Sequence, residues 1–175
     1  MKTSGMDIRR NKERGEWAEL LFMAKAAEHG FKFAKLWGDS APYDMVVDLG
    51  GRFVRVQVKS TMCKTWEGDR HVPPGSYAVF LRHQSSPRYQ RTDFDYLAVY
   101  VIPKDVWYIM PSAEVTPKIG IRVCPGNKSN PYECYREAWH LLHDRPSAPP
   151  PRRNGTYNIY GIIEERVRRG RPHAQ

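Results

Sequence analysis

The chain has 175 residues, with 28 lysines and arginines against 19 aspartates and glutamates, and its formal net charge at pH 7 is +9. This length suits one domain with a single sizeable core, nothing at the N-terminus resembles a signal peptide, and no apolar run approaches the ~20 residues of a membrane span. The three cysteines are odd in number and lack CxxC spacing, which argues against a disulfide framework and a zinc cluster. We therefore expect a cytoplasmic protein of prokaryotic or phage type, without membrane attachment, whose basic balance favours a polyanionic partner.

The first predicted element is a helix from Arg10 to His29, ended by Gly30, a residue common just after the last turn of a helix. Apolar residues recur at helical spacing within it and predict a buried stripe. The members of that stripe are Leu20, Met23, Ala24 and Ala27.

Strands and one further helix are expected downstream. The ranges are residues 31–36, 77–82, 94–102 and 106–110 for single strands, 43–61 for a hairpin, and 132–143 for a short amphipathic helix. This order of helix, several strands and helix predicts an α/β or α+β sandwich with one central sheet. The proline-rich stretch RPSAPPPRRNG then cannot continue a helix, so we expect one domain over residues 1–144 and a linker with a basic tail over 145–175.

The two-glycine turn at residues 50–51 fixes the register of the hairpin, because glycine adopts positive φ without steric cost. The expected pairs are Asp48 with Phe53, Val47 with Val54, Val46 with Arg55, Met45 with Val56, and Asp44 with Gln57. Side chains alternate between the two faces of a strand. The expected apolar face consists of Met45, Val47, Val54, Val56 and Val58.

Three polar side chains, Asp44, Gln57 and Lys59, converge on the other face of this hairpin. Directly opposed residues have Cβ atoms roughly 4.5–5.5 Å apart, so one cation can touch both side chains of the first pair. A solvated face is the simpler interpretation for an arbitrary amphipathic hairpin. The residues from Phe53 to Val58, however, have the aromatic and β-branched bias of a central strand, where charge usually marks a site.

These residues resemble a known family. Glu19, then Pro42-Tyr43-Asp44, then Gln57-Val58-Lys59, are similar to the motif of the PD-(D/E)XK nuclease superfamily, in particular its group I intron homing endonuclease and Holliday-junction-resolvase-like branch. This resemblance implies an α/β fold of the restriction-endonuclease-like type, with a central mixed β-sheet flanked by helices. Tyr43 interrupts the literal PD dipeptide, and glutamine replaces the acid that most members carry at position 57.

The resemblance implies a hard divalent cation, Mg²⁺ with Mn²⁺ as a substitute, that helps water to hydrolyse a phosphodiester. Asp44 would be the principal ligand, and the Gln57 amide oxygen and the Val58 carbonyl would add neutral ligands. Lys59 would orient the attacking water or offset charge in the transition state. The glutamine leaves the site with one negative charge fewer, so metal binding is expected to be weaker.

Glu19 on the first helix is the fourth catalytic candidate and a further metal ligand implied by the resemblance. Glu16 competes with it, since on a helical wheel Glu16 lies closer to the predicted apolar stripe. The resemblance favours Glu19, because its spacing to Asp44 is similar to that in the homing-type members of the family. For either residue, the simpler interpretation is an acid favoured by the helix dipole.

Basic residues concentrate at the two ends of the chain: residues 145–175 hold seven basic and two acidic side chains. Such arms suit nucleic acid, although solubility alone also explains them. The sequence RRGRP resembles the core of an AT-hook, whose arginines enter the narrow minor groove of A·T-rich DNA. The expected DNA contacts are Ser60, which follows the motif lysine, and Arg168, Arg169 and Arg171.

The function hypothesis is thus a metal-dependent endonuclease, active as a homodimer or homotetramer on double-stranded or branched DNA. Within this class, a site-specific homing or restriction-like enzyme competes with a junction resolvase. The rival from another class is a DNA-binding module that kept the fold and lost cleavage, which the Gln57 substitution makes credible.

Overall fold

A computed structural model describes residues 7–38, 40–64, 73–81 and 87–143. All of them belong to the first of the two compact units into which the chain divides, Met1–Arg145. The predicted linker and basic tail, including Arg168, Arg169 and Arg171, lie outside the described residues. No helix in the described part of the chain has the length and apolarity needed to cross a membrane.

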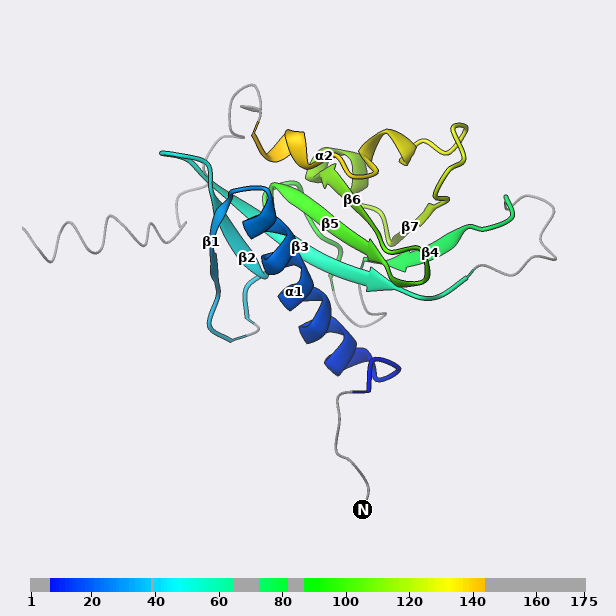
Figure 1. The fold of residues 1–175 in the computed structure, drawn as a ribbon, viewed down its shortest axis with the longest axis horizontal. Coiled ribbons are helices and arrows are strands. Elements are labelled where there is room, and N and C mark those ends of the chain that lie inside the picture. Colours follow the sequence, from blue (N-terminus) through cyan, green and yellow to red (C-terminus); the bar gives the residue numbers. More distant parts are fainter. Residues whose placement is uncertain (1–6, 39, 65–72, 82–86, 144–175) are drawn as a thin grey trace, which may run out of the picture. The chain divides into compact units, whose positions relative to one another are not determined.

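A five-stranded sheet forms the centre of this unit, in the order β1-β2-β3-β5-β6 (Figure 1). The strands are β1 (Lys32–Lys35), β2 (Met45–Asp48), β3 (Phe53–Thr61), β5 (Tyr96–Val101) and β6 (Val106–Pro111). Strands β3 and β5 run parallel and the other neighbours antiparallel, so the sheet is mixed. The predicted α/β fold class with a central mixed sheet is confirmed.

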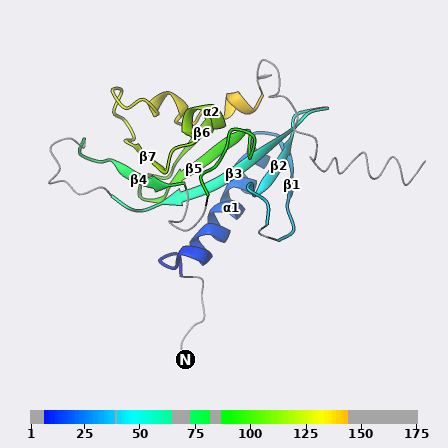
Figure 2. The same ribbon diagram turned by 180° about the vertical axis from the view of Figure 1, so that it is seen from behind.

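A second, two-stranded sheet has no counterpart in the prediction. It pairs β4 (Tyr77–Phe80), which the sequence predicts as a strand of the central sheet, with β7 (Gly120–Val123), which is absent from the predicted strands. The views from both sides show these strands beside β5 and β6, away from β1 and β2 (Figures 1 and 2).

Helix α1 (Asn11–Glu28) begins and ends within one residue of its predicted limits. At its C-terminus the N–H groups of Gly30 and Phe31 donate to the carbonyls of Ala27 and Ala26, each at 2.9 Å, and Gly30 has the positive φ of 79° that this cap requires. The predicted buried stripe is wrong: Leu20 is 52% exposed, whereas Ala18, Phe22 and Ala26 are buried.

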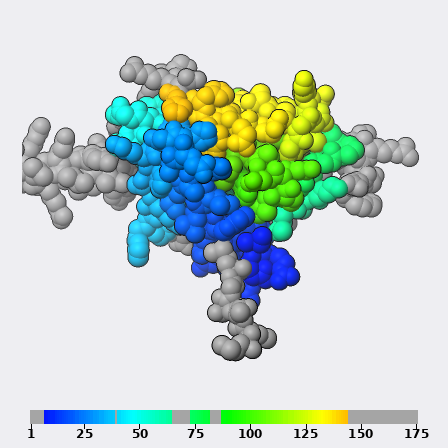
Figure 3. Space-filling view, in the orientation of Figure 1, coloured from blue at the N-terminus to red at the C-terminus, as the bar shows by residue number. Residues whose placement is uncertain are grey.

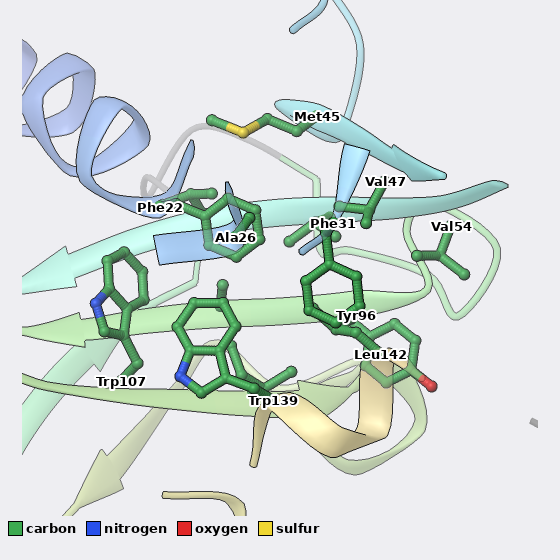
Figure 4. Packing of buried hydrophobic residues seen from close by; sticks show 14 of the residues in the cluster. Phe22, Ala26, Phe31, Met45, Val47, Val54, Tyr96, Trp107, Trp139 and Leu142 are labelled. Atoms are coloured by element: carbon green, nitrogen blue, oxygen red, sulfur yellow. The ribbon is translucent and has the colours of Figure 1, made fainter. Parts of the chain in front are cut away.

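Large aromatic side chains set the rotation of α1. The ring of Phe22 lies 5.7 Å from those of Trp107 and Trp139, and the three rings fill the space between helix and sheet (Figure 4). Ala18 and Ala26, one turn to either side of Phe22, are small enough to let the helix approach the strands. The core under α1 includes the buried faces of β2 and β3.

The opposite face of the central sheet is covered differently. There Tyr77, Val79, Ile121 and Val123 of the second sheet pack with buried residues of β5 and β6. That cluster contains no residue of β2 or β3. The second sheet also reaches the end of β3, where the Thr61 hydroxyl donates to the Ala78 carbonyl at 2.6 Å.

The helix predicted at residues 132–143 is wrong. Two 3₁₀ segments, η2 (Glu133–Tyr135) and η3 (Trp139–Leu142), occupy this stretch, with Glu137 between them at a φ of 51°. Glu137 exchanges backbone and side-chain bonds with Trp107: its N–H donates to the Trp107 carbonyl at 2.8 Å, and its carboxylate accepts the Trp107 N–H at 2.6 Å. These hydrogen bonds to β6 hold the segment in a non-helical conformation despite its helical periodicity. On the surface, the segment borders α1, which is blue in Figure 3.

The remaining short elements connect the strands. A 3₁₀ turn η1 (Ile102–Lys104) joins β5 to β6, and a single helical turn α2 (Ser112–Val115) follows β6.

Candidate active site

The hairpin that carries the polar residues has the predicted register. Its ladder pairs Met45 with Val56, Val46 with Arg55, Val47 with Val54, and Asp48 with Phe53. Both turn glycines have positive φ, 71° at Gly50 and 106° at Gly51. The predicted apolar face is buried against α1, and the exposed fraction of each of its five side chains is 6% or less.

Asp44 lies where the ladders of β1 and β3 both end. Its N–H donates to the Val56 carbonyl at 3.0 Å, and its carbonyl accepts the Leu36 N–H at 3.2 Å. Because the β2 ladder stops at Met45–Val56, the N–H of Val58 has no β2 backbone partner and donates instead to Asp44 Oδ2 at 2.7 Å. The Asp44 carboxylate thus accepts, through its side chain, the next β3 N–H beyond the backbone ladder.

Gln57 is buried, with 5% of its surface exposed, and its side chain turns towards Asp44. Its Nε2 donates to Asp44 Oδ2 at 2.7 Å and to the Val58 carbonyl at 3.2 Å. A half-turn of the amide exchanges nitrogen and oxygen, so the same side chain can present either a donor or an oxygen ligand here. The carboxylate, the amide and the Val58 carbonyl therefore share one point.

Lys59 lies two residues further along β3, half-buried on the same face as Gln57. Its Nζ lies 5.8 Å from the centre of the Tyr89 ring, close enough for a cation–π interaction. Tyr89 in turn packs edge-on against the fully buried Phe94, with ring centres 5.2 Å apart. An aromatic support for the lysine was not visible in the sequence, because residues 59 and 89 meet only through the fold.

Glu19 faces the same region from α1, whereas Glu16 is exposed and does not line the cleft. The wheel argument for Glu16 relied on the wrong apolar stripe; relative to the observed stripe of Ala18, Phe22 and Ala26, Glu19 is the nearer acid. Its Oε2 forms an ion pair with Lys35 Nζ at 2.8 Å. This hydrogen bond is the largest cause of the raised pKa of Lys35.

A cleft of about 440 Å³ brings these side chains together. Glu19, Asp44, Gln57, Val58, Lys59 and Ser60 all line it. Sequence reasoning missed Asn11 and Arg14 of α1 and Phe80 of β4, which also line it. Helical spacing from Glu19 would have found Asn11, which lies two turns before it on the same face, whereas Phe80 has no such signal.

Burial governs the acidity of Asp44. The pKa of Asp44 rises from 3.8 to about 6, chiefly because burial penalises the charged form. The Val58 N–H bond, Lys59 and Lys35 lower the pKa, whereas the Glu19 charge adds to the rise. A carboxyl that is costly to ionise without a nearby cation is typical of a position where a cation binds.

The donor chemistry fits a hard divalent cation. Two carboxylates, a backbone carbonyl and an amide oxygen are available, all of them oxygen ligands of the kind that Mg²⁺ prefers. In the described part of the chain, no three His, Cys, Asp or Glu side chains gather at one point, so neutral oxygens would have to complete such a site.

Tyr43, which interrupts the PD dipeptide, has a structural role. Its ring packs on the Arg55 guanidinium, 5.8 Å from ring centre to Cζ, and Arg55 is held by Asp95 at 3.0 Å. The aromatic ring thereby anchors the chain directly before Asp44.

The comparisons with known proteins agree with this geometry. A model of the PD-(D/E)XK endonuclease family matches residues 9–142, most of the chain and all the residues of the cleft. This chain belongs to the PD-(D/E)XK endonuclease family. The predicted resemblance to this family is thereby confirmed, while the roles of the motif residues stay predictions.

A solved structure is also similar to this PD-(D/E)XK endonuclease. It is a bacterial homing endonuclease, I-Ssp6803I, with 25% sequence identity and a TM-score of 0.60. The match covers 90% of this chain and 98% of that one. No curated protein sequence matches.

Proposed function

We propose that this endonuclease hydrolyses phosphodiester bonds of double-stranded DNA with Mg²⁺, for which Mn²⁺ substitutes. One observation carries the proposal. A single cleft beside β3 brings together Asp44, Gln57, the Val58 carbonyl and Lys59, and Glu19 of α1 lines the same cleft. Membership of an endonuclease family gives the reaction class.

Asp44, Glu19, the Val58 carbonyl and the Gln57 amide oxygen are the residues that would hold the metal. When bound, the metal supplies charge neutralisation at the phosphate and a more acidic water. Lys59 lines the cleft, with its Nζ beside the Tyr89 ring, and would stabilise negative charge that develops at the phosphate. Ser60 lines the same cleft and is a candidate phosphate contact.

Site-specific cleavage of duplex DNA is the favoured form of the activity. The similar solved structure is a homing endonuclease, and the match covers nearly the whole of that chain. This similarity favours a homing or restriction-like enzyme over a junction resolvase. Cutting both strands requires two such clefts, since each chain supplies one strand-cutting site. We therefore propose a homodimer or homotetramer, which light scattering of the purified protein tests.

Gln57 supports a second candidate, a DNA-binding module without cleavage. The position holds a neutral amide that donates to Asp44, so the site has one charge fewer for a metal. The two carboxylates that remain in the cleft favour the active enzyme over this candidate.

One assay separates these candidates. The protein is incubated with supercoiled plasmid, linear duplex and a four-way junction, each with Mg²⁺ and with EDTA. We expect metal-dependent cleavage of plasmid and duplex, loss of cleavage in Asp44→Ala and Lys59→Ala, and DNA affinity within a few-fold of the parent, because phosphate contacts elsewhere dominate affinity. Lys25→Met, on the same helix as Glu19 but outside the cleft, is the matched control.

Cleavage that persists in both cleft variants would contradict the assignment of the site. Binding without cleavage under every metal condition would select the DNA-binding module, and preference for the junction would select the resolvase.

A further inference from the structure

Lys35 is a cation beside the proposed metal site that the sequence did not bring to attention. It ends β1 directly opposite Met45, the residue after Asp44, and its Nζ lies 2.8 Å from Glu19 Oε2. The Glu19 side chain is only 19% exposed, while that of Lys35 is 44% exposed. The ammonium thus reaches from the rim of the sheet to a half-buried carboxylate.

This ion pair adds positive charge beside the cleft. Two carboxylates, Asp44 and Glu19, and two cations, Lys59 and Arg14, line the cleft, Gln57 adds no charge, and Lys35 contributes a further cation through Glu19. A divalent cation that enters must therefore bind next to Lys35, or Glu19 must exchange the lysine for the metal. Either event works against metal binding, because like charges a few ångströms apart repel strongly at the edge of a protein interior.

We infer that Lys35 competes with the divalent cation for Glu19 and so sets the metal concentration at which the cleft is loaded. This inference rests on the proposed metal-dependent function. Lys35 is a positioning residue: it holds Glu19 in the metal-free enzyme and releases it when the cation binds. In a site that already lacks one acid, this competition makes loading weaker than Asp44 and Glu19 alone would give.

A purely structural role for the pair is the simpler interpretation, and it has a different consequence. Strand β1 is held by its backbone ladder to β2, with Phe33 packed on the core, so its position does not depend on Lys35. An ion pair whose lysine is open to solvent contributes little to stability. A structural pair would affect folding slightly and leave metal binding unchanged.

The test measures Mn²⁺ binding to the full chain without DNA, by electron paramagnetic resonance of free Mn²⁺, for the parent protein and Lys35→Met. We expect the Kd for Mn²⁺ to fall about two- to tenfold, the range that removal of one partly screened neighbouring charge gives. Lys35→Arg should keep the parent value. Lys25→Met is the matched control. It breaks the ion pair of Lys25 with Glu28, also 2.8 Å long, which lies on the helix of Glu19 but outside the cleft.

An unchanged or higher Kd in Lys35→Met would overturn the inference. Lys35→Gln gives the same comparison with a polar side chain if the methionine variant folds poorly. Failure of the proposed function gives a different result. In that case the parent protein would show no Mn²⁺ binding that is lost in Asp44→Asn, and the inference would fall with the proposed function.

Discussion

At the scale of the residue, the site depends on where one strand begins. Strand β2 begins at Met45, so the backbone of Asp44 closes both neighbouring ladders while its side chain takes the next N–H, that of Val58. If the β2 ladder extended one pair further, a backbone carbonyl could accept the Val58 N–H, and the Asp44 carboxylate would not be needed as its acceptor. Gln57 then restrains the same oxygen of Asp44 from the neighbouring strand.

Asp44→Asn should stabilise the metal-free protein at high pH. The pKa of Asp44 rises from 3.8 to about 6 on folding, so the folded state favours the protonated carboxyl, and the stability that this provides at low pH is lost as pH rises through that window. The variant avoids the loss, and at pH 8 we expect a gain of about 3 kcal/mol in the free energy of unfolding. Urea denaturation at pH 4 and pH 8 measures it.

The pH 4 measurement is the control for this prediction, because the Asp44 carboxyl is then largely protonated in the folded parent and the two proteins should be nearly equally stable. A gain of the same size at both pH values would show that burial of charge is not the cause.

Gln57→Glu should bind metal more tightly but fold less stably without it. The change replaces an amide donor, 2.7 Å from Asp44 Oδ2, by a second carboxylate. Like charges at this distance, with one hydrogen bond removed, should reduce the free energy of unfolding by about 1–3 kcal/mol at pH 8. We expect the variant to stay active and to need less Mg²⁺. Denaturation in EDTA and a Mg²⁺ titration of cleavage measure the two effects.

Gln57→Leu, which removes both the donor and the ligand, serves for comparison. A folded but inactive Gln57→Glu variant would mean that the amide is needed as a donor and that its role as a ligand is wrong.

At the scale of the element, the rotation of α1 decides which acid enters the cleft. Phe22 packs between Trp107 and Trp139, and this places Glu19 beside Lys35 while Glu16 stays exposed. The predicted stripe of Leu20, Met23, Ala24 and Ala27 has acceptable helical spacing but leaves Phe22, the largest apolar side chain of the buried face, out of the core.

Phe22→Ala and Leu20→Ala test this rotation as a pair. Phe22 is fully buried, so its truncation should cost about 3–5 kcal/mol, because it removes the packing of the ring and leaves a cavity. Leu20 is 52% exposed, and its truncation should change stability by about 0.5 kcal/mol or less. Urea denaturation compares the two variants. Equal losses of stability, or a larger loss at Leu20, would contradict the observed packing of α1.

At the scale of the whole molecule, four elements far apart in the sequence build one cleft. Helix α1 contributes Arg14 and Glu19, β3 contributes Gln57 to Ser60, the residue before β2 contributes Asp44, and β4 contributes Phe80. The second sheet covers part of β5 and β6, and its strand β4 also contacts the end of β3 and contributes Ala78 and Phe80 to the cleft.

The basic tail should act in binding and not in chemistry. The family match ends at residue 142, the residues of the cleft all precede it, and residues 145–175 carry seven basic and two acidic side chains. A chain that ends at Asp144 should bind DNA more weakly, with a log–log salt slope reduced by about 0.9 for each phosphate that the tail no longer neutralises, yet cut bound DNA at a similar single-turnover rate. Fluorescence anisotropy across a salt series measures the slope.

If Arg168 to Pro172 reads the minor groove, the double variant Arg169→Ala with Arg171→Ala should weaken binding to A·T-rich duplexes more than to G·C-rich ones. Equal weakening would leave only a basic tail. A truncated chain that unfolds would instead show that the tail packs on the core.

The sequence by itself determined the hairpin and the polar residues that it brings together. The two turn glycines and the alternation of valines set the register of four predicted pairs, because hairpin pairing is local and one slipped residue would expose the whole apolar face. The fifth predicted pair, Asp44 with Gln57, is not part of the ladder and meets through its side chains. It also determined the limits of α1, the mixed central sheet and, through the motif residues, the endonuclease family.

Only the tertiary structure decided features that depend on partners distant in the chain. The rotation of α1 follows from the rings of Trp107 and Trp139, and the 3₁₀ segments at residues 133–142 follow from bonds between Glu137 and β6. Pairing of Lys35 with Glu19 likewise needs a helix and a strand to meet. Helical and strand periodicities report only whether a face is buried, whereas the neighbour on that face is fixed by the packing of the whole core.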